Sequence, residues 1–429
     1  MLQNERSVYF CYTKLQHGDC KIRGIISMTL LLRNRGALLL LMFNIFLVFT
    51  GIGLVVPIMP TYMRELHISG STVGMLVAAF SLTQLIFSPV AGRLSDSLGR
   101  KKIIVVGMIV FALSEWLFGS ASSTYLLFAA RFLGGVGAAF IFPAVMAYAA
   151  DVTSDEERAK GMGFITAAIT TGFIIGPGIG GILAEYGIRV PFYAAAIAGG
   201  LAAIITALIL PESLTAERRR ASKDVVKQSL PAQLMRSYRE PYFLSLIIVF
   251  VASFGLANYE TVFGLFVDHK FGFTAKDIAY IITFGSIAGA VVQATAFGWI
   301  LNKFGDKKVI SYSLVISSVF VFLTLFVHKY WLIVVVTFIV FLAMDVLRPA
   351  ISTQMSKVAP EQQGFVAGLN SAYTSLGNII GPIVAGFLFD LDINYPYLSA
   401  AIVLMLCFVL SMKAKSNQIS ETKCRISRR

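Results

Sequence analysis

Five ionisable residues lie inside long apolar stretches of the chain: Glu115, Arg131, Glu260, Asp345 and Arg348. A charged side chain at the centre of a bilayer costs about 2.5–3.5 kcal/mol, so residues of this kind are usually functional. A carboxylate in such surroundings can bind a cation or exchange a proton. Asp345 and Arg348 are three residues apart and share a helix face, so a structural, mutually neutralising pair is the alternative. We favour a functional role for Glu260 and Asp345 and leave Glu115 undecided.

Aromatic side chains flank these two carboxylates. Tyr259 and Phe263 lie close to Glu260 in sequence, and Phe341 precedes Asp345 by one helical turn. The chain has 34 Phe, most of which must serve packing, but helical spacing places Phe263 and Phe341 beside a carboxylate. An acidic group with aromatic walls suits an amphipathic organic cation, through charge attraction, cation–π contact and apolar burial.

The elements that position these residues are membrane-spanning helices. The 429 residues are 57% hydrophobic and 14% charged, with a mean hydropathy of +0.76, which indicates a polytopic membrane protein. Apolar runs of spanning length, roughly 17 to 25 residues, form two sets of six. They lie near 36–60, 72–91, 103–119, 125–149, 161–184 and 190–210, and near 242–267, 277–300, 309–327, 330–353, 364–389 and 394–412. We therefore expect an all-α transmembrane fold with an N-terminal bundle at 36–210, a polar linker at 211–241 and a C-terminal bundle at 242–414.

The two sets of spans repeat one another. An offset of about 206 residues superimposes two charged turns, with Gly99 on Gly305, and with a shift of one residue it also matches Gly172–Pro177 in the fifth span with Gly377–Pro382 in the eleventh. Parallel six-span repeats are typical of transporters, with the substrate site between the halves near the midplane. The sequence thus predicts two pseudo-symmetric six-helix bundles around such a site.

The first charged turn runs from Gly92 to Lys102. Gly92 and Gly99 are expected to permit a tight reversal, with Arg100 near anionic head groups. We favour a role for Asp96 as a latch at the N-terminus of a neighbouring helix, which would hold one conformation. A simple positive turn is the alternative. The second copy has Asn302 in place of Asp96, so any latch is asymmetric.

The fifth span has a row of glycines. Gly172, Gly176 and Gly180 follow at four-residue spacing, with Pro177 and Gly181 beside them. Bare backbone on one face permits a close helix crossing, and the proline permits a kink that could gate. A plain packing seam is the alternative.

The distribution of charge predicts topology. The net charge is +13, but no basic helix alternates with aromatics, which argues against nucleic acid as a partner. Most Lys and Arg fall in both tails, the linker and the loops starting near 92, 151, 301 and 354, so both termini are expected in the cytoplasm. The tails are 1–35 and a basic segment at 415–429. Met28 is an alternative start, so 1–27 are either a tail or an upstream mis-assignment.

Enzyme and cofactor patterns are missing from the sequence. It has no phosphate-binding Gly-x-x-x-x-Gly-Lys-Ser/Thr loop, and neither its four His nor its four Cys have metal-ligand or catalytic spacing. We expect a protein that is not an enzyme, binds no cofactor or metal, and takes its energy from an ion gradient.

Three blocks resemble the motifs of twelve-span drug:proton antiporters of the major facilitator superfamily: Gly92 to Lys102, Leu127-x-x-x-Arg131-x-x-x-Gly135, and Gly172 to Gly181. Further blocks are similar to the Bmr/NorA type of bacterial multidrug efflux pump: Phe43 to Gly53, Phe254 to Glu260, Phe266 to Ala275, Asp345-x-x-Arg348-Pro349, and Gly368 to Asn378. The resemblance extends from about residue 36 to 400.

The resemblance implies export of varied, often cationic drugs, such as fluoroquinolones, dyes and quaternary ammonium compounds, across the cell membrane in exchange for protons. It implies that Glu260 and Asp345 carry the proton coupling and that a monomer functions alone. The positions that it implies for the drug cavity are Phe49, Phe80, Gln84, Arg131, Phe173, Phe263, Phe341, Arg348, Thr374 and Asn378. The gating positions are Gly92, Asp96, Gly99, Arg100, Gly172, Gly176, Pro177, Gly180 and Gly181.

Two other functions stay open. A dedicated exporter of one metabolite, such as a sugar or polyamine, would share the fold, although a sugar cavity should contain more Asn, Gln and Trp. A membrane sensor or scaffold that transports nothing would predict a sizeable soluble output domain, and the longest polar insert is the linker.

Overall fold

The computed structural model describes residues 36–214, 242–358 and 363–426, together with Leu31, Leu234, Ser237 and Tyr238. Most of the predicted linker, and the N-terminal tail apart from Leu31, lie outside these residues. The described part is helical, and twelve of its helices are long and apolar enough to cross a membrane. The predicted all-α transmembrane class is therefore confirmed.

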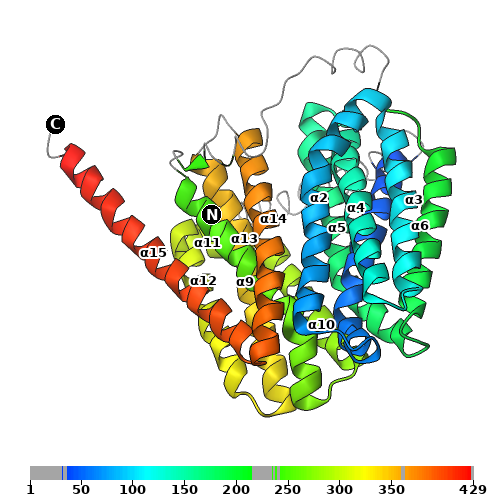
Figure 1. Cartoon of the computed structure of the whole chain (residues 1–429). Helices are drawn as coiled ribbons and strands as arrows, with labels where there is room; N and C mark the ends of the chain where they lie inside the picture. The colour runs from blue at the N-terminus through cyan, green and yellow to red at the C-terminus, as the bar shows by residue number, and fades with distance from the viewer. Residues whose placement is uncertain are drawn as a thin grey trace, which may run out of the picture.

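The first half consists of six spans. They are the first span, Gly36–Glu65, followed by α2 (Gly70–Leu98), α3 (Arg100–Gly119), α4 (Thr124–Val152), α5 (Asp155–Ala184) and α6 (Val190–Ile209). Helix α3 packs against α4 and α6, and α2 packs against α4. Figure 1 shows α2–α6 grouped on the right of the molecule.

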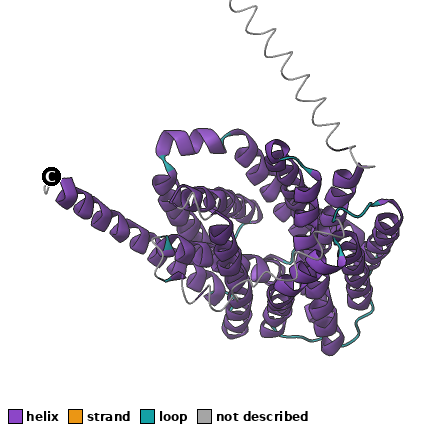
Figure 2. Cartoon of the chain, turned by 90° about the horizontal axis from the view of Figure 1, so that it is seen from above, coloured by secondary structure: helices purple, strands orange, loops and turns teal. Residues whose placement is uncertain are grey.

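The second half repeats this pattern. Its elements are α9 (Phe243–Phe271), α10 (Ala275–Thr295), the short α11 (Phe297–Phe304), α12 (Asp306–Leu323), the 3-10 turn η2 (Thr324–Phe326), α13 (Tyr330–Val358), α14 (Gln363–Leu391) and α15 (Tyr395–Ile426). Helix α14 packs against α9, and α13 packs against α10 and α12. Seen from above, the helices of the two halves surround a central region (Figure 2).

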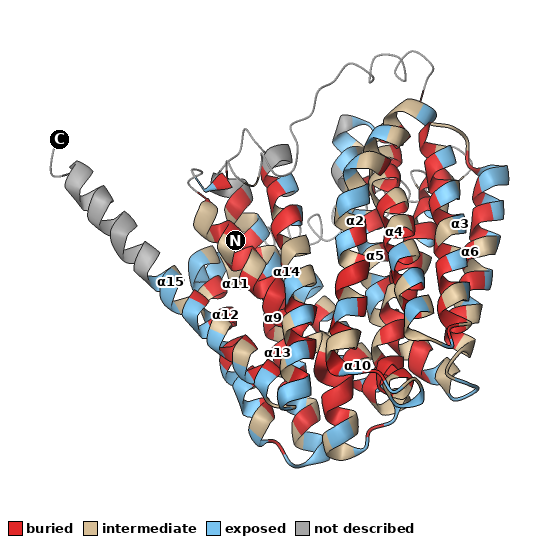
Figure 3. Ribbon diagram, viewed as in Figure 1, coloured by how far each residue is buried: buried red, intermediate tan, exposed pale blue. Residues whose placement is uncertain are grey.

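The outer surface of the bundle is apolar. Buried residues gather inside each half, while large hydrophobic side chains such as Ile197, Leu208, Phe284 and Phe387 are more than half exposed (Figure 3). Soluble monomers rarely expose apolar surface on this scale, whereas a lipid-facing surface requires it. Burial therefore agrees with hydropathy in assigning a membrane-embedded bundle.

The two ends of the bundle differ. We call the end that carries residues 92–100, the start of α5 and the start of α9 the linker end, and the other the opposite end. At the opposite end Val55, Ile58 and Tyr62 of the first span join one continuous core with residues of the second half. Nearer the linker end, Leu38, Leu41 and Ile45 belong to a separate core of the first half. Within the described part of the chain, the halves thus share a core toward the opposite end only.

Candidate functional site

The second half brings together the two predicted coupling carboxylates. Glu260 on α9 and Asp345 on α13 are both partly exposed. Arg348 lies one turn beyond Asp345 and is an exposed residue. The charge of Arg348 acts on both carboxylates, and the charge of Asp345 acts on Glu260. The predicted Asp345–Arg348 pair and Glu260 therefore form one electrostatic cluster.

The sequence did not point to Gly289 as a neighbour of this cluster. It lies buried on α10, and a methyl group there would collide with the Asp345 carboxylate. One turn earlier, a methyl group on Gly285 would lie 3.2 Å from the Phe341 ring. Two glycines four apart on α10 thus face Phe341 and Asp345, which are four apart on α13. The matching spacings were a usable signal, but pairing them requires knowing that α10 and α13 are adjacent.

If the chain carries out the proton-coupled drug export that the sequence resemblance implies, Gly289→Ala is expected to reduce dye transport by about tenfold, because overpacking forces the carboxylate away from its position. Transport can be measured as ethidium efflux from cells that lack other pumps. Gly298→Ala is the matched control, since a methyl group on Gly298 meets nothing within 4 Å. Equal rates for both variants would mean that the position of Asp345 is not limiting.

Aromatic side chains on the same two helices pack around Tyr259, the residue before Glu260. Phe263 is completely buried and stacks on Tyr259 with ring centroids 5.5 Å apart, while Phe341 meets Tyr259 edge-on at 6.0 Å. The Tyr259 hydroxyl shares a hydrogen bond of 3.0 Å with Thr337. In this conformation Phe263 is a core residue, so its predicted contact with a drug requires the aromatic rings around Tyr259 to rearrange.

The first half supplies its own aromatic and cationic groups. Phe49 and Phe173 meet edge-on, with centroids 4.8 Å apart, and Phe173 is 44% exposed. The Arg131 guanidinium lies 5.8 Å from the centroid of Phe80 and 5.0 Å from that of Phe118. The predicted cavity residues of this half therefore lie in two groups, around Phe49 and around Arg131.

Glycines of α4 explain how α2 reaches this position. A methyl group on Gly135 would lie 2.5 Å from the Phe80 carbonyl and 3.2 Å from the Gln84 nitrogen, so α2 packs directly on the α4 backbone. Gln84 itself is partly exposed, one turn from Phe80. The spacing Arg131-x-x-x-Gly135 thus combines a cation with the close approach that brings Phe80 to it.

Helix α14 contributes Thr374 and Asn378. Both are partly exposed and lie one turn apart, while Gly377 between them packs against α9. A methyl group on Gly377 would lie 2.7 Å from the Phe254 nitrogen. The close α9–α14 contact leaves the Thr374 and Asn378 side chains off the seam.

The predicted glycine row of the fifth span makes the expected close crossing. Methyl groups on Gly172, Gly176 and Gly180 would lie 2.7, 2.6 and 2.9 Å from carbonyl oxygens of the first span. Gly181 faces the other way, toward Ala279 of α10 in the second half. Helix α5 continues through Pro177 to Ala184. One helix therefore packs on its own half through one face and on the other half through the next.

The predicted turn is shorter than expected. Helix α2 extends to Leu98, so Gly92 lies inside the helix and takes no part in the reversal. Gly99 alone makes the turn, with a φ of 110°, and Gly305 repeats it with a φ of 79°. Such positive φ values favour glycine. The charged residues before Gly99 continue the helix because none of them breaks it.

Asp96 is bound within its own half in this conformation. It forms an ion pair with Arg100, whose Nε also donates to Asp151 Oδ2 at 3.2 Å. The Arg100 backbone N–H donates to Glu212 Oε1 at 2.9 Å. Arg100 is the first residue of α3, so Asp96 lies at the start of the next helix of its own half, and whether this contact acts as a latch stays a prediction.

Comparison with known proteins identifies the family. The sequence profile of the Major Facilitator Superfamily matches residues 41–293 and 245–422. The chain belongs to the major facilitator superfamily. "Multidrug resistance protein 2" of Bacillus subtilis is 50% identical over 88% of this chain and 96% of its own length. "Quinolone resistance protein NorA" of Staphylococcus aureus (strain COL) is 41% identical over 83% of this chain and 90% of its own length.

Solved structures share the major facilitator fold. A bacterial homologue of the human lysosomal transporter Spinster has a TM-score of 0.75 at 16% identity, covering 88% of this chain and 96% of that chain. The nucleoside transporter NupG has a TM-score of 0.70 at 16% identity, covering 88% and 98%. At such low identity the likeness concerns the fold alone, and it confirms the predicted twelve-helix architecture.

Polar contacts join the two halves of this superfamily member at the opposite end. Arg64 pairs with Asp268, and Lys276 Nζ lies 2.8 Å from Glu185 Oε1. Asp390 at the end of α14 accepts hydrogen bonds from the first backbone N–H groups of α2, at 2.6 Å from Gly70 and 2.8 Å from Ser71. A carboxylate is favoured there because the N–H groups at a helix start lack partners and carry partial positive charge. None of these residues was predicted, since each contact joins segments far apart in sequence.

Small residues bring the same helices together. Methyl groups on Gly74 and Gly386 would collide with the carbonyls of Pro382 and Gly70 across the α2–α14 contact. A methyl group on Gly181 would collide with Ala279 across the α5–α10 contact. The superfamily member is therefore closed at the opposite end by backbone-to-backbone packing.

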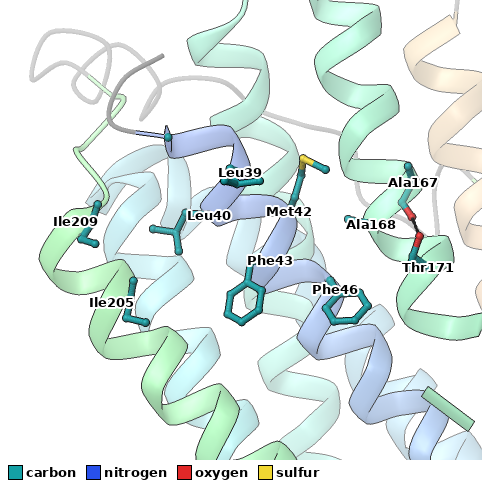
Figure 4. A pocket seen from close by; sticks show the side chains of 11 residues that line it. Leu39, Leu40, Met42, Phe43, Phe46, Ala167, Ala168, Thr171, Ile205 and Ile209 are labelled. Atoms are coloured by element: carbon teal, nitrogen blue, oxygen red, sulfur yellow. Dashed lines mark hydrogen bonds between the residues drawn. The ribbon is translucent and has the colours of Figure 1, made fainter. Parts of the chain in front are cut away.

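An apolar pocket of about 830 Å³ lies in the first half, between the first span, α5 and α6. Leu39, Phe43 and Phe46 of the first span line it with Ala167 of α5 and Ile205 of α6 (Figure 4). The Thr171 hydroxyl at its rim donates to the Ala167 carbonyl at 2.7 Å, which leaves little for a polar ligand to bind. None of the predicted cavity residues lines this pocket.

Proposed function

We propose that this chain is a proton-coupled multidrug efflux antiporter of the cell membrane that exports amphipathic, often cationic drugs by alternating access. The observation that carries the proposal is the cluster of Glu260, Asp345 and Arg348 inside a membrane-spanning bundle. Relatives named for multidrug and quinolone resistance, 41–50% identical over most of the chain, support the substrate class. The exchange partner is the proton, because a carboxylate can bind either a proton or a cationic guest.

The linker end faces the cytoplasm in this proposal. Most Lys and Arg lie at that end, as the positive-inside rule requires. The halves meet at the opposite end, so this conformation is one in which guests exchange with the cytoplasm. Opening the opposite end then requires breaking the Arg64–Asp268 and Glu185–Lys276 pairs and withdrawing Asp390 from the start of α2.

The cycle couples two flows through the same oxygens. In the conformation open to the outside, the carboxyls of Glu260 and Asp345 take up protons and the cation leaves. In the conformation open to the cytoplasm, the carboxyl O–H bonds break, the protons pass to water, and the carboxylates bind the next cation. Where more than one proton moves per monovalent cation, the membrane potential adds about 2.3 kcal/mol per net charge per 100 mV.

The test uses purified protein in liposomes with an acidic lumen. Ethidium is expected to accumulate in the lumen while the proton gradient lasts and to leave when an ionophore collapses it. The matched control is the double variant E260Q/D345N, which is expected to accumulate none. Ethidium that distributes without regard to the gradient in both samples would overturn the proposal and favour a dedicated exporter or a non-transporting protein.

A further inference from the structure

A second pair of ionisable residues lies in the first half, away from the coupling cluster. Glu115 on α3 and Arg131 on α4 are each only 7% exposed. Glu115 Oε2 and Arg131 Nε have no hydrogen-bond partner among the described residues. Buried polar atoms are almost always paired, so two orphaned charged atoms on the adjacent helices α3 and α4 call for an explanation beyond packing. A pair retained only for stability would have its hydrogen bonds made.

The groups around Glu115 determine whether its carboxyl group is ionised. Arg131 is the charged group that acts on Glu115 within the described part of the chain. The first span presents Gly51, where a methyl group would lie 3.3 Å from Glu115 Oε1 and would overlap Phe111. Helix α6 presents Gly199, likewise against Phe111. Helix α2 presents Phe80 to Arg131, the other member of the pair.

The Arg131 end of the pair reaches the proposed drug cavity. Its guanidinium lies over Phe80 at 5.8 Å, and Phe80 is one of the positions expected to contact drugs. A cationic guest beside Phe80 adds positive charge to this region and competes with Arg131 for the ring face. Additional positive charge near a carboxyl group favours its ionised form. Arrival of the guest and departure of a proton from Glu115 are therefore linked.

We infer that Glu115 is a second proton-binding site, located in the first half, and that Arg131 connects its occupancy to a cationic guest beside Phe80. The inference rests on the proposed antiport. With the cavity empty, the Glu115 carboxyl holds its proton; when a cation enters, the O–H bond breaks, the proton passes to water, and the carboxylate remains beside Arg131. The proton returns when the cation leaves. Each half of the molecule then contributes protons to the exchange.

The direct test counts protons. The purified full chain in weakly buffered detergent receives tetraphenylphosphonium, and a pH indicator reports the protons released per protein. E115Q is expected to release one proton fewer than the wild type, while E65Q, at an exposed acid that ends the first span of the same half, releases as many as the wild type. E115Q that releases the full wild-type number would overturn the inference.

Further variants separate this role from a structural one. R131Q is expected to show the same deficit as E115Q, and the double variant no larger a deficit, because both remove one linked step. E115D retains a carboxyl and is expected to restore the lost proton. Additive deficits in the double variant would contradict the link through Arg131.

A pH titration of the protein without any guest covers the remaining outcomes. One titrating group fewer in E115Q than in the wild type is expected even where that variant no longer binds tetraphenylphosphonium. Identical titrations would overturn the inference. A wild type that releases no protons on adding tetraphenylphosphonium would refute the antiport itself, and the titration would still decide whether Glu115 exchanges a proton.

Discussion

Replacing Asp345 by Asn, or Glu260 by Gln, is expected to lower the maximal dye gradient about tenfold for each pH unit of imposed proton gradient. One pH unit on one exchanged proton is worth about 1.4 kcal/mol, which corresponds to a factor of ten in concentration. Removing one exchangeable proton removes that factor, whereas a loss of speed alone would leave the final gradient unchanged. The measurement is the steady-state ethidium ratio across proteoliposomes at several imposed pH differences.

The two control variants replace a glutamate of the first half and an aspartate of the second half by the corresponding amide. Glu65→Gln and Asp306→Asn neutralise residues at the two ends of the bundle and should leave the ratio unaltered. A steady-state ratio in D345N or E260Q that follows the pH difference as steeply as in the wild type would exclude that residue from coupling.

Gly74→Val and Gly386→Val are each expected to abolish most transport by preventing closure of the opposite end. Both added side chains would overlap a backbone carbonyl of the partner helix, and a carbonyl cannot rotate away as a side chain can. Overpacking of this kind costs about 1–3 kcal/mol, which shifts the balance between conformations by about 5- to 150-fold. The shift should favour the conformation that is open at the opposite end.

The conformational shift can be measured separately from transport. A cysteine placed at Thr283, on the α5–α10 contact, should react faster with a water-soluble maleimide in G74V and G386V than in the parent. Gly200→Val is the control, because a methyl group on Gly200 meets nothing within 4 Å. Normal transport by G74V would mean that the α2–α14 contact is not part of the cycle.

The fold could be predicted from the sequence because its signal is local. Twelve apolar runs, a repeat and a bias of basic residues require no knowledge of which helices touch. The grouping of Glu260 with Asp345 and Arg348 also followed, since charges inside apolar runs are rare enough to be conspicuous. Helical spacing correctly placed Gly172, Gly176 and Gly180 on one seam.

The remaining features depend on neighbours that the sequence does not state. The importance of Gly289 follows only from its contact with Asp345 on another helix, and that of Asp390 only from its hydrogen bonds to the start of α2. Gly92 was assigned to a turn because glycine before charged residues suggests one, whereas the helix continues to Leu98. Phe263 was placed beside a carboxylate by spacing, but spacing does not tell which face of α9 packs into the aromatic core.

Helix α10 contacts both α5 of the other half and the Asp345 carboxylate, so a movement at one contact is expected to displace the other. Ala279 abuts Gly181 of α5, and Gly289 abuts Asp345. Ten residues separate these points, or about 15 Å along a rigid rod. A tilt of about 5° around the outer contact displaces Gly289 by about 1.3 Å, enough to uncover or squeeze a carboxyl oxygen. In the proposed transport cycle, motion between the halves therefore reaches Asp345 through the helix itself.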